Sequence, residues 1–242
     1  MSLGSAGELA GRRVLVIGAA SGIGQAVADA CRARGADVLT ADRRAEPGSI
    51  QIDLLDQDSV RELTARLTAI DGLVITAGTS LRATITDTTP AQWHDLLALN
   101  VAATADAVRV LLPSLRRGDH PAVVTVASAT GLRAYPGFAA YAASKAALIH
   151  WSRTAAHEFA ADGIRLNCVC PGPTDTPMLR SDVRDSAAAL AAIATNTALG
   201  RLGTAPEIAE PVAFLLSRRA SFITGAVIPV DGGECCHDGH LG

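Results

Sequence analysis

The run Arg13–Ile17 leads directly into Gly18-Ala19-Ala20-Ser21-Gly22-Ile23-Gly24, and the Ala-rich stretch Gly22–Arg34 follows. A short β-branched run predicts a buried strand, and the longer amphipathic stretch predicts a helix. Glycines spaced as G-x-x-x-G-x-G let the backbone turn tightly and approach a pyrophosphate closely, and the unpaired N–H groups at the start of the helix face that phosphate. A glycine-rich turn alone is weak evidence. Its place between a strand and a helix predicts a dinucleotide-binding loop that includes Ser21 and Ile23.

The same alternation of short β-branched runs and longer Ala/Leu-rich stretches continues along the 242 residues. Strands are predicted at Arg13–Ile17, Asp37–Ala41, Ile50–Ile52, Leu73–Thr76, Ala122–Ala127, Arg165–Val169 and Ala226–Val230. Helices are predicted at Gly22–Arg34, Ser59–Leu67, Pro90–Leu115, Ala139–Ala161 and Pro206–Leu216. Such spacing predicts βαβ units with right-handed crossovers, and hence a doubly wound parallel sheet of seven strands with helices on both faces. No linker or internal repeat divides the chain, so we expect one α/β Rossmann domain with its core at about residues 9–233.

Acidic residues stand where the second and third predicted strands end. Asp42 lies 18 residues beyond Gly24. An acidic side chain there accepts hydrogen bonds from the ribose hydroxyls of the adenosine half, so we expect NAD to be preferred over NADP. Arg43-Arg44 opposes this expectation, because arginine clamps a phosphate, and a simple turn aspartate is the structural alternative. Asp53-Leu54 closes the third strand and is expected to flank the adenine.

The stretch Pro171–Thr204 follows a predicted strand and contains Pro171, Pro173 and Pro177 close together. It is longer than an ordinary connection between a strand and a helix, and ligands bind at the carboxyl ends of the strands in such sheets. We expect a mobile lid over the site, and a surface excursion with its own helix is the alternative.

Composition argues against several classes of protein. The formal net charge is −3 with a pI near 6.0, and no basic block occurs, which argues against a nucleic-acid partner. No uninterrupted apolar run of about 18 residues occurs, so we expect no membrane-spanning helix, and the first eleven residues lack the features of a secretion signal. The five cysteines include no CxxC pair, which is typical of a reducing, cytoplasmic compartment.

The last residues, from Gly233 to His240, contain two cysteines and two histidines. Adjacent cysteines near a free chain end make poor zinc ligands. We therefore expect no metal site there, and a tail that is disordered or contacts a neighbouring subunit.

Three side chains with chemical potential follow the fifth predicted strand. Ser128 ends that strand, and Tyr141-Ala142-Ala143-Ser144-Lys145 begins 13 residues later. Tyr141 and Lys145 are four residues apart and share one helix face. A lysine ammonium beside a phenol is expected to lower the phenol pKa from its usual value of about 10 towards the range useful for proton transfer. Taken singly, the three residues have structural alternatives: a turn cap, a core tyrosine and a solvated lysine.

These motifs together resemble the short-chain dehydrogenase/reductase family in its common shorter type. The family's glycine motif is matched by Gly18, Gly22 and Gly24. Its Asn-Ser-Tyr-Lys tetrad is matched by Asn100, Ser128, Tyr141 and Lys145. The resemblance runs from about Leu9 to Gly233 and includes Pro171-Gly172, Thr176, Ile223-Thr224-Gly225 and Asp231-Gly232-Gly233.

The resemblance implies an oxidoreductase that transfers a hydride between NAD(H) and an alcohol or ketone. In this role Tyr141 is the general acid/base, and Ser128 binds the substrate oxygen. Lys145 lowers the tyrosine pKa and contacts the nicotinamide ribose, and Asn100 holds a water that relays the proton. The other residues expected to bind the cofactor are Ala77, Gly78, Pro171, Gly172, Thr174 and Thr176. A homotetramer is implied, with a dimer as the next choice, through Pro90–Leu115 and Ala139–Ala161.

Two positions depart from the family pattern. Ile17 stands where the family usually has Thr, and Ile75-Thr76 stands where it usually has Asn-Asn before Ala77-Gly78. Because the usual side chains tie the strand ends together, we expect lower local rigidity here with unchanged chemistry.

Two other functions remain open at this stage. The first is an NADPH-dependent 3-oxoacyl reductase of fatty-acid or polyketide type, and the second is a non-catalytic dinucleotide sensor, which has no need of an intact tetrad. The predicted substrate walls suggest a mostly apolar, medium-sized substrate, with Arg82 or Arg133 available for a carboxylate. Those walls are Thr130, Leu132, Arg133, Tyr135 and Pro136.

Overall fold

The computed structural model describes residues 7–44 and 47–236 and contains a parallel sheet of seven strands. The strands are β1 (Arg13–Ile17), β2 (Asp37–Asp42), β3 (Ile50–Gln51), β4 (Gly72–Ile75), β5 (Ala122–Val126), β6 (Arg165–Pro171) and β9 (Val227–Val230). Their order is β3-β2-β1-β4-β5-β6-β9. The chain leaves β1 towards β2 on one side and returns to β4 on the other, which places a crevice at the carboxyl ends of β1 and β4. The predicted doubly wound α/β sheet is confirmed.

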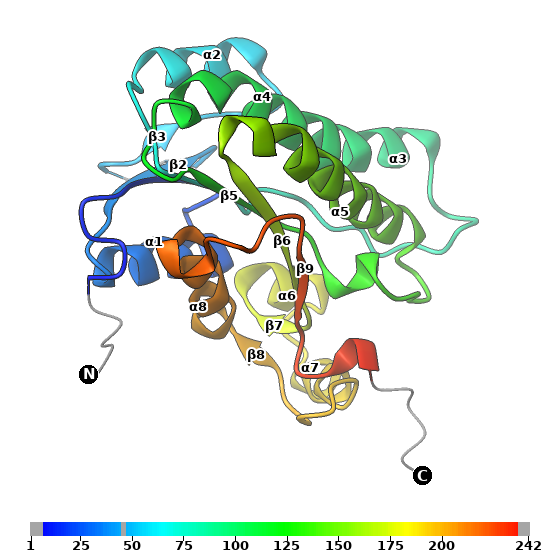
Figure 1. Cartoon of the computed structure of the whole chain (residues 1–242). Coiled ribbons are helices and arrows are strands. Elements are labelled where there is room, and N and C mark those ends of the chain that lie inside the picture. The colour runs from blue at the N-terminus through cyan, green and yellow to red at the C-terminus, as the bar shows by residue number, and fades with distance from the viewer. Residues whose placement is uncertain (1–6, 45–46, 237–242) are drawn as a thin grey trace.

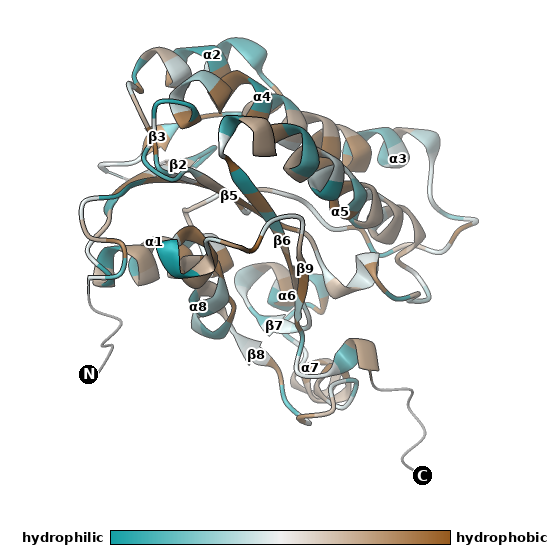
Figure 2. Cartoon of the chain, in the orientation of Figure 1, coloured by the Kyte–Doolittle hydropathy of each residue, from teal (hydrophilic) through white to brown (hydrophobic). Residues whose placement is uncertain are grey.

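Helices cover both faces of this sheet (Figure 1). On one face lie α1 (Gly22–Ala33) and α8 (Ala205–Leu216), which pack against each other. On the other lie α2 (Gln57–Ala65), α4 (Thr104–Leu115) and α5 (Ala139–Phe159). Figure 2 shows the apolar strands enclosed between these two layers, with hydrophilic residues on the outward parts of the helices.

The strands alternate their side chains between the two layers. In β1, Val14 and Val16 belong to the apolar cluster under α1 and α8, whereas Leu15 and Ile17 belong to the cluster under α2, α4 and α5. All four side chains are fully buried or nearly so. A strand that is buried on both faces has to be continuously apolar, which is why Arg13–Ile17 lacks the alternation of a surface strand.

The predicted helix Pro90–Leu115 consists of α3 (Pro90–Leu97), a π-helical segment at Ala98–Ala103 and α4. By length and composition alone this stretch could cross a membrane, because the mean hydropathy of its most apolar window is 1.5. Polar and charged residues, including Asp95, Asn100 and Asp106, interrupt this stretch, so the expectation of no membrane-spanning helix, which rested on an uninterrupted apolar run, stays a prediction. Here Ala107 and Leu111 pack onto the sheet, and the π-helical segment buries Asn100 beside the predicted site, so one side of this stretch belongs to the core.

The long connection after β6 has more structure than the sequence predicts. It contains β7 (Thr174–Asp175), α6 (Pro177–Asp182), α7 (Ala187–Ala194) and β8 (Gly203–Thr204). β7 and β8 pair in parallel and join the two ends of the excursion at its base. We use "the α6–α7 segment" below for residues 177–194.

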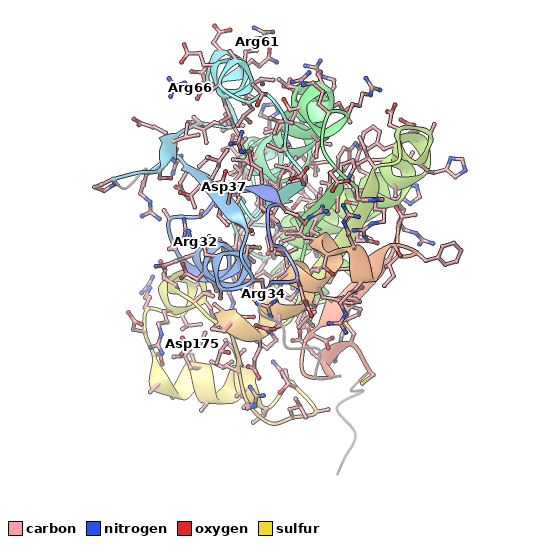
Figure 3. All side chains as sticks on the ribbon, turned by 60° about the vertical axis from the view of Figure 1, so that its left-hand side comes forward. Arg32, Arg34, Asp37, Arg61, Arg66 and Asp175 are labelled. Atoms are coloured by element: carbon pink, nitrogen blue, oxygen red, sulfur yellow. The ribbon has the colours of Figure 1, made fainter. Side chains whose placement is uncertain are left out.

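Charged side chains cover the outer faces of α1 and α2 (Figure 3). Arg32 and Arg61 each pair with an aspartate three residues earlier in the same helix, at 3.1 and 2.8 Å. Exposed pairs of this kind stabilise a fold little. Arg34 differs, because only 10% of its side chain is exposed and it pairs with Glu210 on α8. This contact joins the two helices on that face of the sheet.

Candidate active site

A pocket of about 550 Å³ lies at the carboxyl ends of the strands. Its walls come from the glycine-rich loop, the ends of β2, β4, β5 and β6, the start of α5 and the α6–α7 segment. All the residues predicted to bind the cofactor line it: Gly18, Ser21, Gly22, Ile23, Gly24, Asp42, Asp53, Leu54, Ala77, Gly78, Tyr141, Lys145, Pro171, Gly172, Thr174 and Thr176. Of the predicted tetrad, Ser128 also lines the pocket, and Asn100 is completely buried behind its wall.

The glycine-rich loop is compact enough to require its glycines. Gly18 has φ +89°, a conformation that side chains disfavour. A Cβ at Gly24 would lie 2.0 Å from the carbonyl oxygen of Gly18. The loop therefore presents backbone rather than side chains to the pocket, as a pyrophosphate site at a helix N-terminus requires. The residues present fit a nicotinamide dinucleotide.

Thr76 connects the ends of β1 and β4 at the place where this chain lacks the side chains usual in the family. Its hydroxyl lies 3.0 Å from the carbonyl oxygens of both Ile17 and Gly18 and donates to them. The backbone N–H of Thr76 also donates to Ile17, at 2.9 Å. One threonine therefore bonds the end of β4 to the start of the glycine-rich loop, while the expectation of lower local rigidity stays a prediction.

Asp42 ends β2 with both carboxylate oxygens oriented by the backbone. Oδ2 accepts from the N–H of Ala20 at 3.0 Å, and Oδ1 accepts from the N–H of Arg44 at 2.9 Å. The carboxylate is therefore held at the mouth of the pocket. Arg43 and Arg44 also line the pocket there and are exposed.

Asp53 and Leu54 lie farther along the same wall. The Asp53 carboxylate accepts from the N–H of Leu55 at 2.9 Å, and its own N–H donates to Ser59 at 3.1 Å. These bonds define the turn after β3, so Leu54 is buried beside the region where an adenine is expected.

Tyr141 and Ser128 face each other across the pocket. Tyr141 lies in the first turn of α5, and Ser128 follows β5 in extended conformation. The Ser128 hydroxyl accepts from the N–H and the hydroxyl of Thr130, at 3.2 and 2.9 Å. The Ser128 hydroxyl acts to lower the pKa of the Tyr141 phenol. One substrate oxygen can therefore contact both hydroxyls.

Lys145 is 4% exposed, and its ammonium lies 5.8 Å from the centre of the Tyr141 ring. Its Nζ donates to the carbonyl of Val126 at 3.3 Å. A Cβ at Gly78 would lie 3.2 Å from this Nζ and 3.0 Å from Oδ1 of Asn100. Gly78 therefore allows both side chains to approach the pocket closely.

The pKa values of Tyr141 and Lys145 differ from the sequence expectation. Burial raises the pKa of Tyr141 to about 12, against the opposing effect of Ser128, and the charge of Asp182 raises it further. Burial also lowers the pKa of Lys145 to about 8. The predicted net lowering of the tyrosine pKa is therefore not found, because desolvation disfavours both charged forms.

Asn100 lies in the π-helical segment, and both polar atoms of its side chain form hydrogen bonds. Its Oδ1 accepts from the N–H of Thr79 at 2.9 Å, and its Nδ2 donates to the carbonyl of Thr79 and the hydroxyl of Ser144, each at 3.0 Å. π-Helical turns occur frequently at functional sites. This side chain joins the loop after β4 to α5, and hence the cofactor side of the pocket to the helix that carries Tyr141.

The substrate end of the pocket differs in part from the prediction. Thr130, Tyr135 and Pro136 line it, but Leu132 and Arg133 do not. Leu132 is 42% exposed. The Arg133 guanidinium lies over the Tyr135 ring and donates to the carbonyl of Glu234 at 2.6 Å, so it faces the chain terminus.

Two acidic residues that line the pocket have no sequence signal for this position. Asp182, on α6, accepts from the Ser80 hydroxyl at 2.8 Å. Glu234 follows β9 and is 5% exposed. A single glutamate in a terminal segment carries no local signal, so only the return of the chain to the pocket identifies it.

The terminal segment is ordered as far as the structure describes it. A short 3-10 helix at Glu234–Cys236 corrects the expectation of a disordered tail for these residues, while His237–His240 lie outside the described residues. All five cysteines are free, and no group of three or more potential metal ligands occurs among the residues described.

Comparison with known proteins agrees with this geometry. The family described as "Enoyl-(Acyl carrier protein) reductase" matches residues 18–234. The 3-oxoacyl-[acyl-carrier-protein] reductase of Escherichia coli (strain K12) is 33% identical over 239 residues, which cover 92% of this chain and 97% of that protein. The cis-4-hydroxycyclohexanecarboxylate dehydrogenase of Sinomonas cyclohexanicum is 36% identical over 250 residues, which cover 94% and 98%.

Solved structures show the same fold over nearly the whole chain. A short chain dehydrogenase/reductase family protein superposes with a TM-score of 0.86 at 36% identity, covering 95% of this chain and all of the other. The Pseudomonas aeruginosa RhlG/NADP active-site complex superposes with a TM-score of 0.88 at 32% identity, covering 94% and 97%. The chain therefore belongs to the short-chain dehydrogenase/reductase family and is a hydride-transfer oxidoreductase.

Proposed function

We propose that this protein interconverts a secondary alcohol and a ketone, with Tyr141 as the general acid/base. The observation that carries this proposal is the joint placement of Tyr141, Ser128 and Lys145 in the pocket that also contains the glycine-rich loop. A proton donor and a hydride site are then close enough to act on one carbonyl group.

In the reductive direction, the Tyr141 hydroxyl gives its proton to the substrate oxygen while Ser128 donates a hydrogen bond to the same oxygen. The dinucleotide, when bound, supplies the hydride. Thr130 donates its own hydroxyl to Ser128, which leaves the Ser128 proton available for the substrate. In the oxidative direction Tyr141 takes the proton from the alcohol.

Lys145 has two proposed roles, a contact to the nicotinamide ribose and electrostatic support of the tyrosinate. Asn100 is proposed to support a water relay, but both polar atoms of its side chain already have partners. Any relay through this residue must therefore use its backbone carbonyl or the remaining lone pair of Oδ1.

We propose NAD(H) as the preferred cofactor. Asp42 supports this, because its carboxylate is oriented at the pocket mouth and would repel a 2′-phosphate. Arg43 and Arg44 line the same part of the pocket, and the similar RhlG structure holds NADP, so NADP(H) is the competing choice.

The proposed substrate is a small or medium-sized alcohol or ketone. The relative from Sinomonas cyclohexanicum supports a cyclic secondary alcohol. The relative from Escherichia coli supports the second candidate, reduction of a 3-oxoacyl group.

The proposed assembly is a homotetramer in the cytoplasm. Five free cysteines are compatible with a reducing compartment. Only 39% of the most apolar window in Pro90–Leu115 is buried within the chain, and a neighbouring subunit would cover more of it.

The test is a panel of alcohols and ketones assayed with NAD(H) and NADP(H), following the absorbance of the reduced nicotinamide. Substrate-dependent turnover is the expected result. Tight dinucleotide binding without turnover of any compound would favour the sensor instead.

A further inference from the structure

Glu234 is held rigidly at the substrate end of the pocket. The Asp231 carboxylate accepts from the N–H groups of Gly233 and Cys235, at 2.9 and 2.8 Å. Arg133 donates to the carbonyl of Glu234 at 2.6 Å. These bonds orient the turn after β9, so the Glu234 side chain enters the pocket from a fixed backbone position.

One buried polar atom at this point lacks a hydrogen-bond partner among the described residues. The Tyr135 hydroxyl is buried and has no hydrogen-bond partner in the described part of the chain. It approaches the Glu234 carboxylate, acting to lower the pKa of that carboxyl, but without the geometry of a hydrogen bond. Burial is the largest effect on the Glu234 carboxyl and raises its pKa. The negative charge of Asp231 raises this pKa further, and the positive charge of Arg133 lowers it only in part. Buried polar groups are normally satisfied, so this pair points to a ligand.

We propose that Glu234 and Tyr135 bind a second hydroxyl group of the substrate, at a carbon away from the one that is oxidised or reduced. This inference rests on the proposed function, since it places the reacting oxygen at Tyr141 and Ser128. The substrate class is then a diol, a polyol or a hydroxyketone.

The chemistry of the two groups selects a hydrogen-bond donor. A carboxylate only accepts, whereas a phenol both donates and accepts, so a hydroxyl group satisfies both at once. An anionic substrate would meet the like charge of Glu234, which Arg133 compensates only in part, and a plain hydrocarbon would leave the Tyr135 hydroxyl unsatisfied. Arg82, the exposed arginine at this end of the pocket, is accessible to solvent and attracts an anion only weakly.

The test compares compounds that share one ring: cyclohexanol, the 1,2-, 1,3- and 1,4-cyclohexanediols, and 4-hydroxycyclohexanecarboxylate. The readout is the ratio of kcat/KM for each compound to kcat/KM for cyclohexanol. For the wild type we expect at least one diol to exceed cyclohexanol by about tenfold or more, because a site built for a hydroxyl rejects analogues that lack it. We expect the carboxylate to fall below cyclohexanol.

The variants are Glu234→Leu, Glu234→Gln and Tyr135→Phe, with Asp182→Asn as the matched control. Asp182 is another pocket acid, and its carboxylate already accepts from Ser80. Because its charge raises the pKa of Tyr141, its loss is expected to change kcat for all the compounds together and to leave their ratio unchanged. Glu234→Leu is expected to bring the kcat/KM ratio of the preferred diol to cyclohexanol close to one. Glu234→Gln is expected to raise the kcat/KM ratio of 4-hydroxycyclohexanecarboxylate to cyclohexanol, because the like charge is removed. Tyr135→Phe is expected to lower the ratio of the preferred diol to cyclohexanol. Asp182→Asn is expected to leave that diol ratio unchanged.

A separate measurement keeps the inference independent of turnover. Calorimetry determines the affinity of the same compounds for each protein saturated with reduced dinucleotide, where an alcohol has no hydride acceptor. Dinucleotide binding also shows that each variant is folded. If no compound turns over but the diol still binds more tightly through Glu234, the proposed function fails and the hydroxyl site stands. A diol preference that is absent, or unchanged in Glu234→Leu, overturns the inference.

Discussion

At the scale of single residues, the Tyr141 phenol is shielded from solvent and lies beside the Ser128 hydroxyl. It is placed by the first turn of α5, faces Ser128 and lies 5.8 Å from the Lys145 ammonium, measured to the ring centre. Burial makes its phenol a weaker acid than a tyrosine in water. The Tyr141 phenol is therefore set to donate a proton rather than to accept one.

Tyr141→Phe removes the proton but retains the ring. Dinucleotide affinity is expected to change little, because the glycine-rich loop and Asp42 lie elsewhere in the pocket. Loss of general acid–base catalysis is expected to lower kcat by about 10²–10⁴ or more. Steady-state rates and a dinucleotide titration test this, and turnover within about threefold of the wild type would contradict the proposed role.

The raised pKa of Tyr141 also predicts opposite pH profiles for the two directions. Below its pKa of about 12 the phenol carries the proton that reduction needs. Reduction is therefore expected to vary little between about pH 6 and 7, where Lys145, with its pKa of about 8, also stays charged, while oxidation, which needs the phenolate, rises with pH. Oxidation that is fastest at acid pH would show that another group controls proton transfer.

Asp42→Ala tests the choice of cofactor. The wild type is expected to favour NAD(H) by about a hundredfold or more in kcat/KM, since each 1.4 kcal/mol of repulsion and lost hydrogen bonding is about a factor of ten. The variant is expected to lose most of this preference. The measurement is kcat/KM for both cofactors with one substrate, and a wild type that favours NADP(H) would contradict it.

At the scale of elements, hydrogen bonds between different strands, loops and helices hold the walls of the pocket together. Thr76 bonds the end of β4 to the glycine-rich loop, and Asn100 bonds the π-helical segment to α5 and to the loop after β4. Both are buried or half-buried polar side chains whose partners are backbone or hydroxyl groups. Loss of either leaves polar groups unsatisfied next to the cofactor site.

Thr76→Val keeps the shape of the side chain but removes both hydroxyl bonds. The free energy of unfolding is expected to fall by about 1–2 kcal/mol, with weaker dinucleotide binding, because two carbonyls lose a donor. Thr76→Ser is the matched control and is expected to retain most of the cofactor affinity. Urea unfolding and a dinucleotide titration measure the two effects, and equal behaviour of Val and Ser variants would exclude the hydroxyl as the tie.

At the scale of the whole molecule, apolar surface remains for a partner to cover. Leu97 on α3 is 39% exposed, and Phe222, before β9, is fully exposed. Of the small residues on the predicted interface helices, Ala102, Ala143 and Ala146 are exposed, but Ala103 faces the core and is not available to a neighbour. The exposed subset supports the proposed close contact between subunits through the π-helical segment and α5.

We expect a homotetramer of four 24.8 kDa chains, and a dimer if one interface is weak. Light scattering at micromolar protein measures the mass. Ala143→Arg, on α5, is expected to reduce it, whereas Ala65→Arg, at an exposed position on α2, leaves it unchanged. A wild-type monomer would contradict the proposed assembly.

The sequence alone determined the features that depend on local spacing. The glycine loop was predictable because Gly18 and Gly24 belong to one turn, and the shared face of Tyr141 and Lys145 followed from a four-residue interval on a helix. The alternation of buried strands and helices likewise predicted the sheet and its two covered faces. The glycine motif and the Tyr141–Lys145 interval each lie within about one element, and the alternation depends only on the order of the elements along the chain.

Only the tertiary structure decided which distant side chains share the pocket and what burial does to them. Glu234 meets Tyr135 across about a hundred residues, and Asp182 meets Ser80 across 102. Desolvation, which raises the Tyr141 pKa, depends on all the segments that enclose the phenol. No local pattern carries this information, because contacts and dielectric environment arise only when segments far apart in the chain come together.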